Sequence, residues 1–114
     1  MTTSPKLGLA YIVASQAQKE VTHNEALNDL DTLCQLSVKD RHLTTSPASP
    51  EEGDAYIVPS GATGDWSGHE GAIACYYSGW VFKTPKAGFI AFVQDEAKFV
   101  AFNGTSWALL GGFV

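Results

Sequence analysis

The sequence predicts an α+β fold, in which an N-terminal helix packs on a small antiparallel β-domain made of paired hairpins. In residues 1–45, apolar side chains recur at spacings of three and four, the period of an amphipathic helix. From residue 46 onward the apolar period is two, which is typical of strands, and glycine-rich turns separate the apolar runs. The chain has 114 residues, of which 45% are hydrophobic. We therefore expect a single domain over residues 1–114, with a helical segment (1–45) and an antiparallel β-meander (46–114).

The helix is predicted to begin at Thr22, because Thr22-His23-Asn24-Glu25 has the pattern of a capping box. The apolar stripe that follows consists of Ala26, Leu27, Leu30, Leu33 and Cys34. The polar residues between these positions are expected to be solvated, and they are Asn24, Asn28, Asp29 and Asp31. A weaker capping box at residues 15–18 predicts a separate helical turn that ends near Val21.

A short strand at residues 36–38 leads out of the helical segment, because apolar and polar side chains alternate there. Residues 44–54 are predicted to be a loop, since their two prolines disfavour helix at the preceding residue and lack amide donors. Residues 56–58 are predicted to be a strand, and residues 61–71 a glycine-rich loop. The next hairpin is expected to turn at Ser78-Gly79, which places Tyr77 opposite Trp80.

A second meander is predicted from strands at residues 89–93, 99–102 and 107–110, with turns at 94–97 and 103–106. Both faces of these strands are apolar, so both need a cover. We expect the helix to cover one face and a neighbouring subunit to cover the other. The two β units also resemble each other: Pro50-x-x-Gly53 and Pro85-x-x-Gly88 each precede a strand and then an aromatic-turn-Trp hairpin. Two copies are too few for a solenoid, and they favour paired hairpins.

Charge and cysteine content exclude several classes of protein. Seven basic against twelve acidic residues give a net charge of −5, and no basic stripe is present, so we expect no nucleic-acid partner. No apolar run is long enough to span a bilayer, and the first residues lack the features of a signal peptide, so we expect no membrane insertion. Cys34 and Cys75 belong to no metal or redox motif and are expected to be buried, reduced thiols. No cofactor and no metal are expected.

The candidate site is the glycine-rich loop, where acids, a histidine and a tryptophan lie close in sequence. Trp66 lacks an obvious core there and is the aromatic residue expected to be exposed or at an interface. Asp65 and His69 are its nearest polar companions, and Tyr76 lies on the mixed face of the following hairpin. Trp80 and Trp107 are expected to pack in the core.

Three interpretations of this loop stay open beside that of a plain surface turn. An exposed indole with polar neighbours can stack on a sugar, while two carboxylates among Asp54, Asp65 and Glu70 can act as the acid and base of a glycan hydrolase. Asp65, His69 and Glu70 are also possible metal ligands. No spacing such as HExxH supports catalysis, so we expect no enzyme activity and no catalytic residue.

Five blocks follow one another from about Leu7 to Trp107: LGLAYIVASQAQKEVTHNEALNDLD, SPEEGDAYIV, ATGDWSGHEGAIA, W-x-F-x-x-P-x-x-G and F-N-G-T-S-W. In this order they resemble a domain family of unknown function found in structural proteins of alphaproteobacterial phages, prophages and gene-transfer-agent particles. The resemblance implies a component of a fibre, spike or host-attachment apparatus. It transfers no catalytic residue, because the family has none established.

Together these observations predict a non-enzymatic structural and attachment module of a virion, made in the bacterial cytoplasm without a signal peptide. Its expected partners are copies of itself, with a homotrimer favoured, and other virion proteins. The alternative is a carbohydrate-binding module for host surface glycans, with Trp66, Asp65, His69 and Tyr76 as its candidate residues. A cell-envelope glycan hydrolase is the lesser alternative. Assembly and sugar binding can coexist, because an oligomer multiplies a weak sugar affinity.

Overall fold

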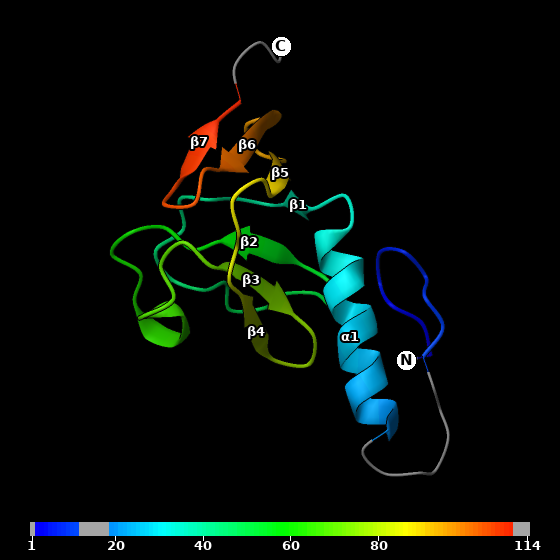
Figure 1. Cartoon of the computed structure of the whole chain (residues 1–114). Helices are drawn as coiled ribbons and strands as arrows, with labels where there is room; N and C mark the ends of the chain where they lie inside the picture. The colour runs from blue at the N-terminus through cyan, green and yellow to red at the C-terminus, as the bar shows by residue number, and fades with distance from the viewer. Residues whose placement is uncertain (1, 12–18, 111–114) are drawn as a thin grey trace.

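The computed structural model describes residues 2–11 and 19–110, and within these ranges one α-helix and seven strands form an α+β fold (Figure 1). Helix α1 spans Lys19–Leu33, and one turn of 3-10 helix spans Gly64–Trp66. The strands are β1 (Ser37–Val38), β2 (Ala55–Ile57), β3 (Ile73–Tyr76), β4 (Trp80–Lys83), β5 (Ile90–Val93), β6 (Lys98–Phe102) and β7 (Trp107–Leu109). The predicted fold class is therefore confirmed. Within the same ranges, no helix has the length and apolar character needed to cross a membrane.

The described strands form two three-strand meanders and one additional short strand. β2, β3 and β4 pair antiparallel in that order, and β5, β6 and β7 do the same. β1 pairs parallel with β5, with Val38 beside Val93, and completes a sheet of order β1-β5-β6-β7. The short strand after the helix and the second meander are thus confirmed.

The internal repeat predicted from the sequence appears as matching backbone hydrogen bonds. The Gly53 N–H donates to the Tyr76 carbonyl, and the Gly88 N–H donates to the Phe102 carbonyl, both at 2.8 Å. Both glycines have positive φ, +92° and +100°, a conformation that glycine adopts without steric cost. In each copy the accepting aromatic residue precedes the hairpin turn, and its ring lies 5.3 Å from a tryptophan ring. The two meanders therefore share one turn-and-hairpin design.

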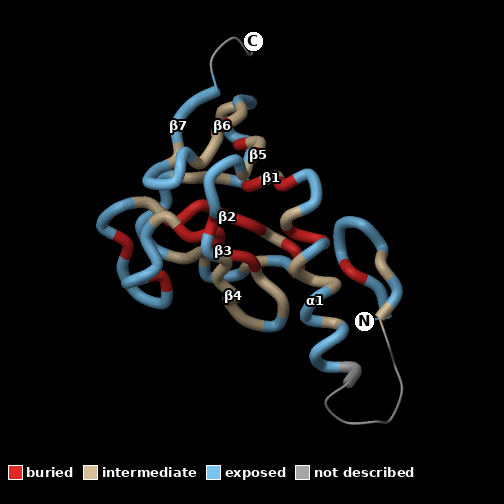
Figure 2. The backbone as a smooth tube through the Cα atoms, viewed as in Figure 1, coloured by how far each residue is buried: buried red, intermediate tan, exposed pale blue. Residues whose placement is uncertain are grey.

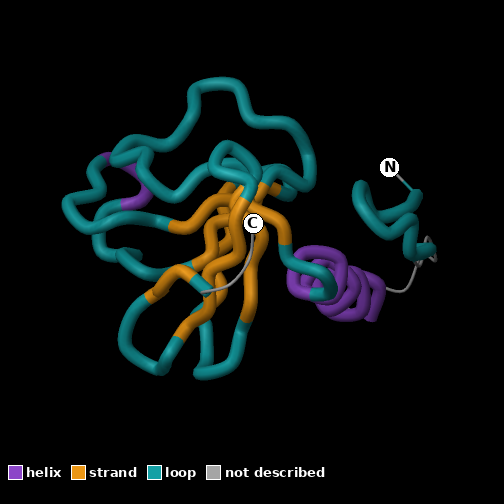
Figure 3. Tube along the Cα trace, turned by 90° about the horizontal axis from the view of Figure 1, so that it is seen from above, coloured by secondary structure: helices purple, strands orange, loops and turns teal. Residues whose placement is uncertain are grey.

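The core lies between the two sheets, which pack face to face (Figure 2). The β1-β5-β6-β7 sheet contributes the buried side chains of Val38, Ala91, Val93 and Val100. The β2-β3-β4 sheet contributes those of Ala55, Ile57, Ile73 and Cys75. The expectation that the helix covers a face of strands β5–β7 is wrong. The β2–β4 sheet covers their inner face, while α1 stands beside both sheets (Figures 1 and 3). A second apolar sheet matches a flat strand face over its whole width, which a single helix does not.

The β3–β4 hairpin differs from the predicted register by one residue. Its loop is Tyr77-Ser78-Gly79, so Tyr76 and not Tyr77 pairs with Trp80. A shift of one residue exchanges the faces of a strand. Trp80 and Phe82 therefore lie on the face away from the main core. The Tyr77 hydroxyl is instead bonded to Asp31 and Thr32 of α1, at 2.9 and 2.8 Å, which holds Tyr77 in the loop.

Helix α1 differs from its prediction at both its start and its buried side. It runs through Thr22 back to Lys19, so a helix start at Thr22 is wrong, and the weaker capping box at residues 15–18 lies outside the described residues. Ala26, Leu30 and Cys34 of the predicted stripe are exposed. The fully buried helix residues among those described are Asp31 and Thr32, so the expectation that Asp31 is solvated is wrong. The helix lies beside the sheets and attaches to them through polar contacts, so its apolar stripe stays largely open.

Of the two cysteines, Cys75 is buried as expected, whereas Cys34 is exposed, so the expectation that Cys34 is buried is wrong.

Asp31 fixes the N-terminal loop (residues 2–11) against α1. Its carboxylate accepts hydrogen bonds from the Ser4 hydroxyl at 2.5 Å, the Lys6 N–H at 3.1 Å and the Leu7 N–H at 2.6 Å. With the bond from Tyr77, four groups replace the water that a buried carboxylate loses. One side chain thus connects the N-terminal loop, the helix and the β3–β4 loop.

We predict that Asp31→Asn lowers the free energy of unfolding by about 2–3 kcal/mol, because charge-assisted bonds to several donors are lost. Urea denaturation followed by circular dichroism measures this change. Asp29→Asn is the matched control on the same helix: Asp29 pairs with Lys83 at 2.6 Å in a partly exposed position. It should cost less than about 1 kcal/mol. Equal losses for the two variants would contradict a special role for Asp31.

Stability should also depend on pH through Asp31. Burial by itself raises the pKa of this carboxyl, but the hydrogen bonds from Ser4, Leu7, Tyr77 and Lys6 outweigh it, and the net pKa is lowered. A carboxyl with a lower pKa in the folded state stabilises the fold above its unfolded pKa, near 3.9. This contribution is lost as pH falls from about 5 through the folded-state value. Urea midpoints at descending pH should therefore fall more steeply for the natural protein than for Asp31→Asn.

Candidate functional site

Trp66, the centre of the predicted ligand site, is fully buried, so its expected exposure is wrong. The 3-10 turn Gly64–Trp66 directs its ring into a second apolar cluster that contains Tyr56, Val58 and Ala74. The Trp66 ring centroid lies 5.5 Å from that of Tyr56 and 5.3 Å from that of Trp80. The one-residue shift of the β3–β4 hairpin provides this cover, because it brings Trp80 to the face where the loop packs. Trp66 therefore presents no ring face to a sugar.

The other candidate residues contribute to packing or to the surface around this cluster. His69 stacks flat on Phe82, with ring centroids 3.7 Å apart and planes 3° apart. Tyr76 is half-buried, with its ring 5.3 Å from that of Trp80 at a steep angle. Asp65 is exposed in the 3-10 turn. The structure brings Trp66, His69 and Tyr76 to one face of the β3–β4 hairpin, where they pack on its aromatic side chains.

The hydrolase and metal interpretations gain little from the geometry. Asp54 Oδ1 lies 3.3 Å from Lys39 Nζ, and Asp54 Oδ2 accepts the Glu51 N–H at 3.0 Å. Both oxygens of this carboxylate are thus engaged in local structure. Within the described residues, no group of three or more His, Cys, Asp and Glu side chains is arranged to hold a metal ion.

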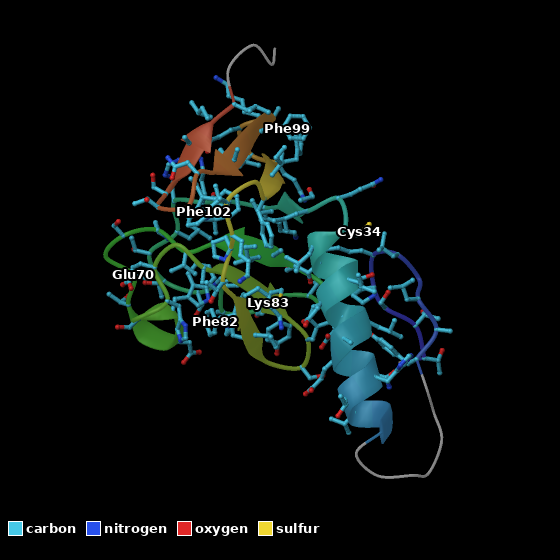
Figure 4. All side chains as sticks on the ribbon, in the orientation of Figure 1. Cys34, Glu70, Phe82, Lys83, Phe99 and Phe102 are labelled. Atoms are coloured by element: carbon cyan, nitrogen blue, oxygen red, sulfur yellow. The ribbon has the colours of Figure 1, made fainter. Side chains whose placement is uncertain are left out.

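A groove between the two sheets lies next to the predicted site and was missed by the sequence reasoning. We call it the inter-sheet groove; it consists of two adjoining hollows of about 430 and 250 Å³. Glu70, Gly71 and Thr105 line both hollows. The larger hollow adds Arg41, Ser106 and Trp107. Figure 4 shows Glu70 on the side of the molecule away from α1. The Asn103–Ser106 turn was predicted, but nothing in its sequence indicates that it meets the loop before β3.

Hydrogen bonds hold both walls of the inter-sheet groove in place. On one wall the Trp107 indole Nε1–H donates to the Gly71 carbonyl at 2.9 Å and joins the two sheets. The Asn103 side chain accepts the backbone N–H groups of Thr105 and Ser106, both at 2.9 Å. On the other wall the Gly71 N–H donates to the Val58 carbonyl at 2.8 Å. The groove is therefore preformed.

An ion pair with Glu96 fixes Arg41, which lines the larger hollow. Arg41 donates from Nε and Nη2 to the two oxygens of Glu96, at 2.8 and 3.0 Å. The hydrogen bond from Arg41 is the main reason that the pKa of Glu96 is lowered. The Arg41 guanidinium keeps further N–H donors for another acceptor. Arg41 thus holds its remaining N–H donors in a fixed orientation beside the larger hollow, while the Glu96 carboxylate balances much of its positive charge.

A second feature is the outer sheet face, which we define as Ile90, Phe92, Phe99 and Leu110 on the side of the β1-β5-β6-β7 sheet away from the core. Ile90 is 50% exposed and Leu110 is 43% exposed. The Phe92 and Phe99 rings contact each other, with centroids 5.1 Å apart, and Figure 4 shows Phe99 on this outer side. Beside the end of α1 this face forms a hollow of about 480 Å³. Ile90 and Leu110 therefore remain open on this face, which the second sheet does not cover.

The comparisons with known proteins identify a family without assigning a function. A family model described as "Protein of unknown function (DUF2793)" matches residues 23–108. This range includes the inter-sheet groove and most of the outer sheet face. No curated protein matches the chain.

We predict that Trp66→Ala acts on stability. Removal of a fully buried indole should lower the free energy of unfolding by about 3–5 kcal/mol, since it leaves a cavity between aromatic neighbours. Thermal or urea denaturation provides the measurement. Asp65→Ala, at the preceding and exposed position, should change it by less than about 0.5 kcal/mol. A Trp66→Ala variant as stable as the natural protein would contradict the burial of this side chain.

Proposed function

We propose that this chain, which belongs to the DUF2793 family of proteins of unknown function, is a non-enzymatic structural and attachment module of a phage-like particle. In this proposal copies of the chain assemble through their apolar surfaces, as a homotrimer in a fibre or spike. The particle context is supported by the ordered sequence blocks that resemble structural proteins of phages and gene-transfer agents, from about Leu7 to Trp107. The assembly part rests on the geometry of one surface.

The single observation that carries assembly is the outer sheet face. A sheet with apolar side chains on both sides is stable in water when both sides are covered. Here the second sheet covers the inner side, while Ile90 and Leu110 remain exposed on the outer side. Burial of one large aliphatic side chain contributes about 1.5–3 kcal/mol, so a few such contacts in each copy favour association. Contiguous apolar patches of this kind commonly mark interaction sites.

A carbohydrate-binding module is the second candidate, and the inter-sheet groove favours it. The predicted location at Trp66 is replaced by a site that contains Trp107, which is partly accessible and fixed by its bond to Gly71. The two functions are compatible, because repeated copies in a fibre multiply a weak affinity for each sugar. Glycan hydrolysis has less support, because Asp54 is engaged with Lys39 and Glu51.

We predict that the protein forms an oligomer whose mass is a multiple of 12.2 kDa, and that Ile90→Lys shifts it toward the monomer. A charge at the centre of the apolar interface should weaken association at least about tenfold. Size-exclusion chromatography with light scattering measures both states. Leu43→Lys is the matched control, because Leu43 is an exposed leucine in a loop outside the outer sheet face.

A protein that stays monomeric at about 1 mM would contradict assembly through this face. An oligomer unchanged by Ile90→Lys would place the interface elsewhere. The particle context has its own test, which is mass spectrometry of phage-like particles purified from a bacterium that carries the gene for this chain. Absence of the chain from such particles would contradict that part of the proposal.

A further inference from the structure

The inter-sheet groove combines features that serve one kind of ligand. It is elongated, since its two hollows of about 430 and 250 Å³ adjoin along Glu70, Gly71 and Thr105. It joins apolar surface, from Trp107 in one hollow and Phe102 in the other, to polar groups on the rim. We infer that this groove binds a neutral oligosaccharide, with one sugar ring against Trp107 and its hydroxyl groups bonded to the rim.

The polar groups of the rim are available to a ligand. Among the described residues, the hydroxyls of Ser60, Thr105 and Ser106 and the carboxylate of Glu70 have no hydrogen-bonding partner. A hydroxyl both donates and accepts, and a carboxylate accepts. This mixture matches sugar hydroxyls, each of which also donates and accepts. An apolar ligand would leave these groups without partners.

The apolar surface of the groove is held at a fixed angle. Trp107 is tied by its indole N–H to Gly71, and its ring lies 5.3 Å from the Phe102 ring. An aromatic side chain fixed in this way gains contact area at little cost in side-chain entropy. The C–H face of a pyranose is the apolar part of a sugar, and it fits such a surface.

The charges around the groove favour a neutral ligand over an acidic one. Among the described residues that line the groove, Arg41 is the one cation, and its guanidinium is paired at two nitrogens with Glu96. Glu70 adds a negative charge to the rim, and the whole chain carries a net charge of −5. An anionic ligand would meet a repulsive field here, so phosphorylated or uronic acid chains are disfavoured.

This inference deepens the attachment part of the proposed function and rests on it only for the biological source of the sugar. The groove lies between the sheets and shares no residue with the outer sheet face. A variant of the groove should therefore leave the oligomer unchanged, and Ile90→Lys should leave the sugar affinity of each copy unchanged. Failure of one proposal is thus distinguishable from failure of the other.

The test is titration of ¹⁵N-labelled protein with cellotetraose, maltotetraose, chitotetraose and a galactan tetrasaccharide, each up to about 10 mM, followed by NMR. Tetragalacturonic acid is the acidic comparison. At least one neutral tetrasaccharide should give saturable shifts at the Gly71, Thr105 and Ser106 amides and at the Trp107 indole N–H. The acidic sugar should bind at least about fivefold more weakly than the best neutral one.

Variants of the rim residues test whether those shifts arise from specific sugar binding in the inter-sheet groove. Glu70→Gln and Thr105→Val should each weaken the best neutral ligand at least about fivefold. Glu70→Gln replaces a charged acceptor oxygen by an NH2 donor, and Thr105→Val removes the hydroxyl. Both side chains are exposed, and a spectrum of unchanged dispersion confirms the fold. Asp65→Asn is the matched control, an exposed acid in the same loop, and it should leave the affinity unchanged. No saturable shift with any neutral tetrasaccharide overturns the inference, as does an affinity that neither rim variant changes.

Discussion

The packing of two three-strand meanders against each other is the constraint on which the rest of this structure depends. Each meander has an apolar inner face, and neither is wide enough to bury that face alone. Face-to-face packing buries Val38, Val93 and Val100 against Ile57 and Ile73. It also has two consequences for function. The edges of the sheets leave a polar groove between them, and the sheet that contains β5 and β6 keeps a second apolar face directed outward.

The helix and the N-terminal loop are attached in a different way, through hydrogen bonds more than through apolar burial. Asp31 accepts four of these bonds, and Lys83 adds an ion pair to Asp29. Directional bonds need correct geometry, so they fix the position of the loop at residues 2–11. They leave the apolar stripe of α1 largely exposed, with Leu30 at 56% exposure. The helix therefore adds apolar surface to the molecule beside the outer sheet face.

The two candidate surfaces require different chemistry and lie on different parts of the fold. The outer sheet face is apolar and suits a copy of the same chain, whereas the inter-sheet groove is polar, preformed and suits a sugar. In an assembled fibre each copy would present its own groove, and several weak contacts would act together. Aromatic residues contribute to both surfaces, and the three tryptophans divide between two roles. Trp66 and Trp80 build the second apolar cluster, and Trp107 links the two sheets at the groove.

The sequence by itself determined the local features of this protein. The change of apolar period, the positions of the turns and the repeated Pro-x-x-Gly unit predicted the fold class, the second meander and the paired hairpins, because these features depend on neighbours in sequence. The sequence did not determine which apolar face of one element packs against which face of another. The β3–β4 loop differs from the predicted one by one residue, and this difference places Trp80 against Trp66. Asp31 was expected in solvent but is buried, because it accepts hydrogen bonds from the distant N-terminal loop. Tertiary structure alone brought Gly71 beside Trp107, 36 positions away, because such contacts are selected by the packing of whole sheets.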